Sequence, residues 1–217
     1  MMLNLFSVFD PSTGLFSLNW FSMILFMLLP TPFWKTPSKL SSIMLNLYMK
    51  IMKEIIMHIK TSKPSILMVS MFSYMLTINV MGLMPYVFTP SAHLSMSLAI
   101  ALTMWMSLMM YGWLNSTNNM FTHLVPMGTP APLMPFMVLI ESISNFIRPG
   151  SLAVRLTANM IAGHLLMSLL GNNLSSNFPM MLIIMWLFMG LMVFELAVAF
   201  IQSYVFMTLS TLYSSEI

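Results

Sequence analysis

Long apolar runs follow one another along this chain of 217 residues, and short polar, proline-rich stretches separate them. A helix that crosses a bilayer needs about 20 mostly apolar residues. We expect membrane spans at the following positions: 14–30, 65–84, 93–114, 132–170 and 179–213. With one further helix between the first two spans, the pattern predicts an all-α membrane protein of about six helices, in a single membrane domain over 1–217.

Residues 38–62 have the pattern of an amphipathic helix. Apolar residues recur at the spacing of one helix face, and lysines lie beside that face: Leu40, Ile43, Met44, Leu47, Ile51 and Ile55, with Lys39, Lys50, Lys53 and Lys60. We expect this helix to lie on the membrane surface; a solvated helix of a soluble subdomain is the alternative. The positive-inside rule places the lysines on the matrix side of a mitochondrial membrane, or on the cytoplasmic side in a bacterium.

The last two apolar segments are too long for an upright span. Continuous helices over 132–170 and 179–213 would be about 57 and 52 Å long, against a hydrocarbon core of about 30 Å. Each segment is therefore either two spans with a break, for which Pro149-Gly150 is the candidate in the first, or one strongly tilted helix. We expect two long tilted helices that form a hairpin through the short loop GNNLSSNF, and a loop over 115–132 that is irregular through VPMGTPAP.

Composition excludes a soluble protein. Hydrophobic residues make up 59% of the chain and charged residues 6%, whereas soluble domains carry about 25% charged residues. All six lysines fall between Lys35 and Lys63, so the net positive charge is a local patch and does not indicate a nucleic-acid partner. The absence of cysteine excludes disulfides and thiolate metal sites. We expect no cofactor, no metal and no catalytic residue. The sequence also has no nucleotide-binding loop.

Few ionisable residues lie inside the apolar segments, and they are regularly spaced. Glu141, Arg148 and Arg155 follow one another at intervals of seven, so they drift by only about 20° per step around a helix. Asn145 and Asn159 extend this stripe, and small residues nearby would let another helix approach closely. An ionisable residue in a membrane segment is costly and is by default a candidate functional residue. His164 is nine residues after Arg155 and faces the other way.

The final segment carries Glu195 and Gln202, seven residues apart on one face. Two registers of the hairpin remain open. In one, Arg155 faces Gln202 while His164 faces Glu195. In the other, Arg155 faces Glu195, and the two charges can form a buried structural ion pair.

Several long motifs resemble one family. LAVRLTANMIAGHLL, GTPAPLMPFMVLIESIS, FELAVAFIQSYVFMTLSTLY and NVMGLMPYVFTPSAHLSMSLAIALTMW occur in the order found in subunit a of mitochondrial ATP synthase. The similarity extends from about residue 70 to the C-terminus, and the N-terminal part agrees in layout. One departure is Ser203, where the family usually has alanine in IQAYVF.

The resemblance implies a proton-translocating stator beside a rotating ring of c subunits, in the mitochondrial inner membrane. It implies these roles: Arg155 is the essential arginine, Glu141 lies in the matrix half-channel, His164 and Glu195 lie in the intermembrane-space half-channel, Gln202 faces the arginine, and Asn159 belongs to the arginine motif. The implied partners are the c-ring, the other stator and membrane-sector subunits, lipid and protons. The N-terminus would lie in the intermembrane space and the C-terminus in the matrix, and ATP chemistry would belong to other subunits.

The chemistry of arginine fits the implied role. Arginine is effectively always protonated, so Arg155 cannot carry protons, but its charge favours the ionised form of a carboxylate that faces it. Protons would then pass between two offset routes only on the rotor. The alternatives are a structural membrane subunit of a respiratory complex and a solute transporter, although no internal repeat supports the transporter.

Overall fold

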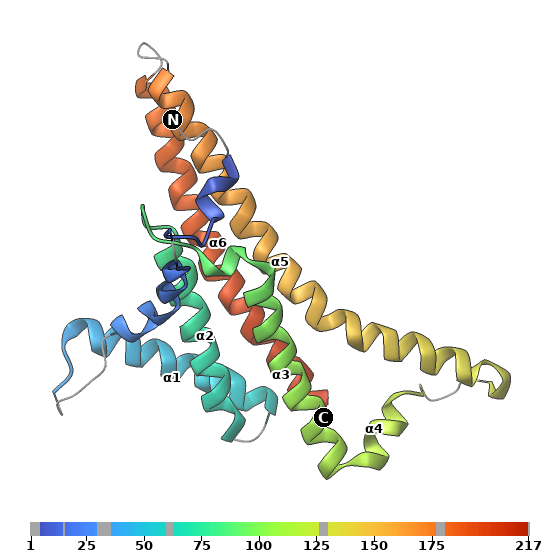
Figure 1. Ribbon diagram of the computed structural model, residues 1–217. Helices are drawn as coiled ribbons and strands as arrows, with labels where there is room; N and C mark the ends of the chain where they lie inside the picture. Colours follow the sequence, from blue (N-terminus) through green and yellow to red (C-terminus); the bar gives the residue numbers. More distant parts are fainter. Residues whose placement is uncertain are drawn as a thin grey trace.

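The computed structural model describes residues 5–14, 16–29, 36–59, 63–125, 130–176 and 181–216. All regular structure in these ranges is helical (Figure 1). The α-helices are α1 Lys39–Ile59, α2 Lys63–Gly82, α3 Leu94–Asn115, α4 Thr117–His123, α5 Met134–Ser176 and α6 Met181–Glu216. Four short 3₁₀ helices accompany them: η1 Leu5–Phe9, η2 Leu18–Leu28, η3 Pro90–Ala92 and η4 Ala131–Leu133.

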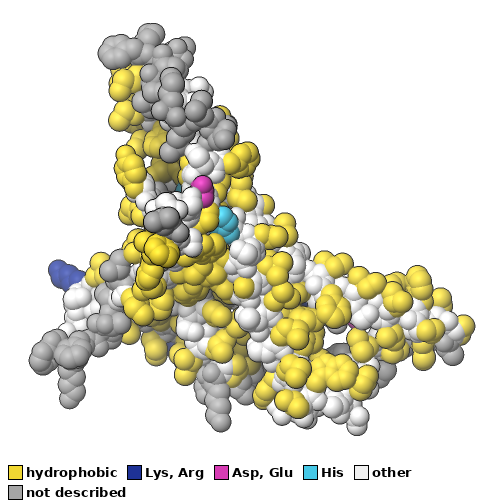
Figure 2. All heavy atoms as spheres, viewed as in Figure 1, with side chains coloured by type: hydrophobic (Ala, Val, Ile, Leu, Met, Phe, Trp, Pro, Cys, Tyr) yellow, Lys and Arg dark blue, Asp and Glu magenta, His cyan; other side chains and the backbone are white. Residues whose placement is uncertain are grey.

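Four of the described helices are long and apolar enough to cross a membrane, namely Pro64–Gly82, Leu94–Asn115, Met134–Asn173 and Met181–Ser215. Apolar side chains cover most of the face drawn in Figure 2, and charged side chains are few there. Soluble proteins rarely expose large continuous apolar surfaces. The chain is therefore a multi-pass membrane protein, as its composition predicts.

The expected first span differs in form from a membrane α-helix. Residues 18–28 form the 3₁₀ helix η2, which at a rise of about 2.0 Å per residue is only about 22 Å long. The Trp20 ring contacts the rings of Phe88 and His93, at centroid distances of 5.7 and 5.3 Å. A crossing over 14–30 stays a prediction, and the prolines that were expected to end it lie outside the described residues.

The expectation of a continuous loop over 115–132 was wrong for part of that segment. Residues 117–123 form α4 and residues 131–133 form η4. The ring of Phe121 in α4 meets the ring of Trp113 at the end of α3 edge-on, with centroids 5.0 Å apart. This packing contact explains why α4 is helical, although its polar sequence does not predict a helix. Residues 126–129 lie outside the described part.

The two long C-terminal helices are confirmed, and α5 passes through Pro149 without a break. Figure 1 shows α5 and α6 side by side near their shared end, after which α5 bends and the helices diverge. A proline inside a helix removes one hydrogen bond and favours a bend. α5 runs to Ser176, beyond the expected end at 170, so part of the predicted connecting loop is helical. The tilt of the hairpin in a membrane stays a prediction.

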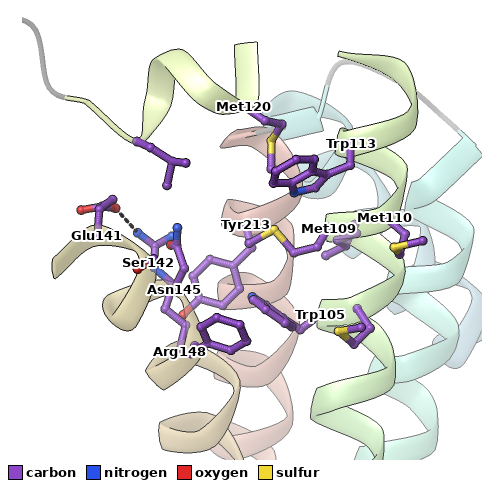
Figure 3. Close-up of a pocket in the computed structure, with 14 residues that line it drawn as sticks. Trp105, Met109, Met110, Trp113, Met120, Glu141, Ser142, Asn145, Arg148 and Tyr213 are labelled. Atoms are coloured by element: carbon purple, nitrogen blue, oxygen red, sulfur yellow. Dashed lines mark ion pairs between the residues drawn. The ribbon is translucent and has the colours of Figure 1, made fainter. Parts of the chain in front are cut away.

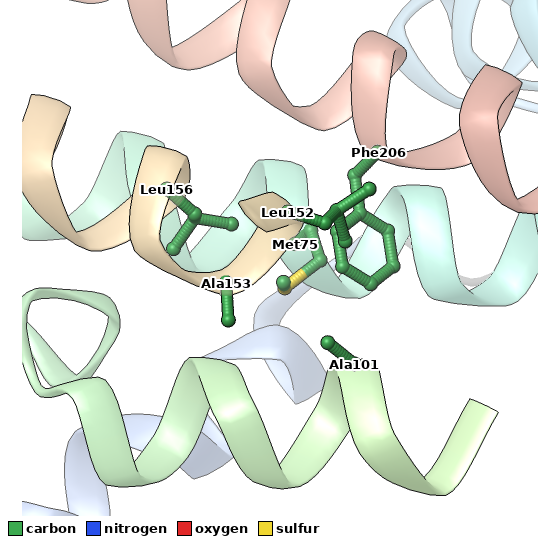
Figure 4. Close-up of a cluster of buried hydrophobic side chains, with 6 residues drawn as sticks. All are labelled: Met75, Ala101, Leu152, Ala153, Leu156 and Phe206. Carbon is green, nitrogen blue, oxygen red and sulfur yellow. The ribbon is translucent and has the colours of Figure 1, made fainter. Parts of the chain in front are cut away.

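A buried cluster where four helices meet holds the bundle together. Its members come from α2, α3, α5 and α6 and pack as Figure 4 shows: Met75, Ala101, Leu152, Ala153, Leu156 and Phe206. A second cluster docks α1, through Ile55, on Met68 and Phe72 of α2 and on Met207 of α6. Lys39, Lys50 and Lys53 are exposed, so α1 is amphipathic as predicted.

Replacing Phe206 with alanine should destabilise the bundle, because a large cavity would open where four helices meet. The cost for a buried phenylalanine is about 3–5 kcal/mol. The measurement is the midpoint of thermal unfolding of the detergent-solubilised chain. Phe200→Ala is the matched control, because Phe200 is 45% exposed; equal losses in the two variants would contradict the packing described here.

Candidate functional site

Arg155 lies on the outer surface of the helix bundle. On α5, its neighbours Ala153, Leu156 and Thr157 are buried, while the Arg155 side chain is exposed. It makes no hydrogen bond or ion pair with any residue that the structure describes. A guanidinium keeps its charge in nearly every environment. The helix therefore presents a permanent positive charge, within a candidate membrane span, to whatever lies beside the bundle.

The first half of the predicted stripe lines a cavity instead. Glu141, Asn145 and Arg148 face a space of about 690 Å³ between α3, α4, α5 and the end of α6 (Figure 3). The remaining wall is mainly apolar and aromatic: Trp105, Met106, Leu108, Met109, Met110, Trp113, Met120, Leu124, Ser142, Phe146 and Tyr213. Arg155 is not part of this wall, so the residues of the stripe serve two different places.

Arg148 connects Glu141 to the last turn of α6. Its Nη2 atom is 3.9 Å from Oε1 of Glu141, and its guanidinium carbon is 5.2 Å from the centre of the Tyr213 ring. Sequence reasoning placed Arg148 on the stripe without a role and missed Tyr213 entirely. The spacing of seven between Glu141 and Arg148 was the available signal for the pair, whereas nothing in the sequence indicated the tyrosine.

Glu195 and the segment Gly163-His164 form a second polar region, where α6 meets α5. Glu195 is only 8% exposed, and its carboxylate lies against Gly163: a Cβ atom on that glycine would be 2.6 Å from Oε1 of Glu195. His164 follows Gly163 directly and meets the Phe9 ring edge-on at 6.2 Å. Its Nε2 atom and Oε1 of Glu195 are buried without a hydrogen-bond partner among the described residues.

The contact between Gly163 and Glu195 distinguishes the two hairpin registers. It sets Glu195 one residue from His164, as in the first register. Arg155 is eight residues earlier on α5, which is about 12 Å along the helix axis. The second register, with its buried ion pair between Arg155 and Glu195, is therefore not the one observed. Gln202 and Asn159 are both partly exposed, and their predicted roles stay predictions.

Other buried polar groups, to which the sequence assigned no role, lie on α2 and in the segment that follows it. Asn79 is 0% exposed and both of its amide atoms lack a partner in the described structure. Gly82 is one helical turn after Asn79 on α2, and Thr89 packs on it. A Cβ atom added to Gly82 would be 2.8 Å from Cγ2 of Thr89 and 3.7 Å from the Met160 methyl group. An amide inside an apolar segment was the only sequence signal for this group.

The fold and these sites define a class: a multi-pass helical membrane protein with a permanent cation on one surface, and with a buried carboxylate and an imidazole near the contact of its two terminal helices. The family model described as "ATP synthase A chain" matches residues 14–215. ATP synthase subunit a of Anopheles gambiae is 52% identical over 225 aligned residues, covering 100% of both chains. That of Locusta migratoria is 53% identical and that of Drosophila melanogaster 52%, again over 100% of each chain. The chain belongs to the ATP synthase A chain family.

Gly163→Ala should impair proton-driven ATP synthesis while leaving stability nearly unchanged. The added methyl group meets the end of a flexible side chain, which can move, so the cost falls on the position of the Glu195 carboxylate. A displacement of about 1 Å at a reacting group can lower a rate by up to about a hundredfold. The measurements are ATP synthesis by reconstituted complexes and their thermal stability. Gly171→Ala is the control, because nothing lies within 4 Å of its added Cβ; equal rates in the two variants would refute the assignment.

Proposed function

We propose that this chain is the proton-translocating stator subunit of an ATP synthase, with Arg155 facing a rotating ring of c subunits. One observation carries the proposal. A permanently charged side chain is exposed on a membrane-spanning helix and has no partner in the described chain. A lipid-facing guanidinium is costly. A second protein that presents a carboxylate at this depth removes that cost.

The charge of Arg155 determines what the facing carboxylate can do. A nearby guanidinium favours the ionised form of an acid. A rotor carboxylate must therefore lose its proton before it passes Arg155 and take up a proton afterwards. Because Arg155 itself does not exchange protons, it separates the two proton routes and does not connect them.

The two polar sites of the chain supply these routes. Glu141 is fourteen residues before Arg155 and His164 is nine residues after it, so on a helix they lie about 21 and 14 Å away in opposite directions. The cavity beside Glu141 is the matrix half-channel of the proposal, and the site of His164 and Glu195 is the half-channel from the intermembrane space. Gln202 and Asn159 support Arg155. Each proton that crosses 100 mV releases about 2.3 kcal/mol, which drives rotation.

The family and the charge pattern support a place in the mitochondrial inner membrane, with other membrane-sector subunits as neighbours. Five crossings, beginning with 14–30, would leave the termini on opposite sides, and Figure 1 shows them towards opposite ends of the bundle. The lysines of α1 then lie in the matrix, with the C-terminus, and the N-terminus lies in the intermembrane space.

Arg155→Ala should abolish proton-driven ATP synthesis in complexes that still assemble. Arg155→Lys should assemble and leak protons, because a buried lysine can lose its charge, whereas an arginine does not. The measurement is ATP synthesis and passive proton flux in reconstituted vesicles, with Lys53→Gln on α1 as a charge-matched control. Normal synthesis by Arg155→Ala would refute the stator function, and loss of assembly with normal proton transport would favour a structural subunit.

Crosslinking should show which surface meets the rotor. The chain has no cysteine, so any crosslink through this chain identifies the position of the single introduced cysteine. Val154→Cys and Ala158→Cys place a thiol at exposed positions beside Arg155, and Thr157→Cys places one at a buried position. We expect the exposed pair to crosslink to a cysteine beside the membrane carboxylate of the c subunit. Crosslinking by Thr157→Cys alone would mean that the opposite face of α5 meets the ring.

A further inference from the structure

We propose that Arg148 is a positioning residue, which holds the Glu141 carboxylate on the cavity wall while its own guanidinium is anchored on the ring of Tyr213. The proposal rests on the function proposed above and assigns a role to two residues that this function does not use. It follows from three features of the site: the anchor on α6, the surroundings of Glu141 and the weakness of the ion pair.

The anchor lies where the two long helices separate. α5 and α6 diverge beyond their shared region, as Figure 1 shows, and Tyr213 is in the last turn of α6. The guanidinium lies over the Tyr213 ring at 5.2 Å, within the range of a cation–π contact. Arg148 and Tyr213 therefore join α5 to the end of α6 beside the cavity, and both line it (Figure 3).

On the cavity wall, Glu141 is accompanied on α5 by the polar side chains of Ser142, Asn145 and Arg148. The Ser142 hydroxyl already donates to the carbonyl oxygen of Leu139, and the Ser144 hydroxyl donates to the main-chain carbonyl of Glu141. Neither hydroxyl therefore holds the carboxylate. Arg148 is two helical turns away, about 10.5 Å along the axis, so its side chain must lie along α5 to reach Glu141. The Tyr213 ring fixes it in that direction.

The ion pair between Arg148 and Glu141 is weak enough to position the carboxylate without holding it permanently. Its separation of 3.9 Å is long for an ion pair, and the Arg148 and Glu141 side chains are 29% and 40% exposed. Partly exposed pairs contribute little to stability. An ionised Glu141 is attracted to the guanidinium by its charge, whereas a protonated carboxyl lacks that charge and is held more weakly. Arg148 thus returns Glu141 to the same position after each proton leaves.

The test measures ATP-driven proton pumping by reconstituted complexes, expressed per assembled complex. Arg148→Gln and Tyr213→Leu should each slow pumping about two- to fivefold, the range that corresponds to losing one partly exposed cation–π contact. The double variant should be no slower than the slower single variant, because both remove the same device. Tyr213→Phe keeps the ring and should restore most of the rate lost in Tyr213→Leu.

Two controls match these changes. Lys53→Gln removes a positive charge from α1, and Tyr111→Leu removes an exposed tyrosine from α3 outside the cavity wall; both should pump at the parent rate. A purely structural role of Arg148 would lower the amount of assembled complex and leave the rate per complex unchanged. If Arg148→Gln does not assemble, the pumping rates of Tyr213→Phe and Tyr213→Leu still test whether the Tyr213 ring is needed.

The outcomes separate this proposal from the one on which it rests. Parent rates in Arg148→Gln or Tyr213→Leu, equal slowing by Tyr213→Phe and Tyr213→Leu, or multiplied effects in the double variant would overturn the positioning role. If Glu141→Gln is slow in the same assay, the proposed function survives that failure. Parent rates in both Glu141→Gln and Arg155→Ala would instead overturn the proposed function.

Discussion

The close contact between the Glu195 carboxylate and Gly163 shows how the two long helices lie against each other. Because Gly163 has no side chain, α6 can bring a carboxylate almost to the surface of the α5 backbone. Small residues allow such close approach in membrane helices, where packing replaces the hydrophobic effect as the main source of association. In this register Glu195 lies against Gly163, the residue before His164, and Arg155 is on the outside. The absence of a side chain at Gly163 thus lets the Glu195 carboxylate occupy this position without a clash.

Polar groups in the membrane region fall into two kinds. Serine and threonine hydroxyls along the helices bond to the carbonyl of the preceding turn, as Ser203 does to Phe200 at 2.8 Å. The side chain by which this chain departs from its family pattern is therefore satisfied locally. Asn79, His164 and Glu195 instead keep buried atoms without partners in the described structure. Leaving such atoms unpaired in an apolar medium is costly, so these three side chains differ from the hydroxyls that their own helices satisfy.

Sequence periodicity predicted most of the architecture, because helix length and apolar composition alone decide what can cross a bilayer. The long hairpin and the amphipathic α1 followed from it. The pattern did not predict α4, because that helix is stabilised by the packing of Phe121 on Trp113, and a local sequence pattern does not show such a contact. The 3₁₀ conformation of residues 18–28 could not be predicted either, since the spacing of apolar residues in a short segment does not distinguish a 3₁₀ helix from an α-helix.

The candidate site was predictable in its residues but not in its geometry. Spacing grouped Glu141, Arg148 and Arg155 on one stripe, yet the bend and divergence of α5 direct the first two into a cavity and the third outwards. The hairpin register was open because the length of the connecting loop does not determine which residues of the two helices face each other. It was decided by a steric detail at Gly163, and the contribution of Tyr213 depends on where α6 ends in space.

Pro149 has a consequence for the cavity that involves the main chain alone. Proline has no amide hydrogen, so the carbonyl oxygen of Asn145, four residues earlier, lacks the donor that it would have in an uninterrupted helix. Asn145 lines the cavity. The proline thereby leaves a main-chain acceptor without its usual helical donor on the stretch of α5 that carries Glu141 and Arg148, and no substitution of the Asn145 side chain removes that acceptor.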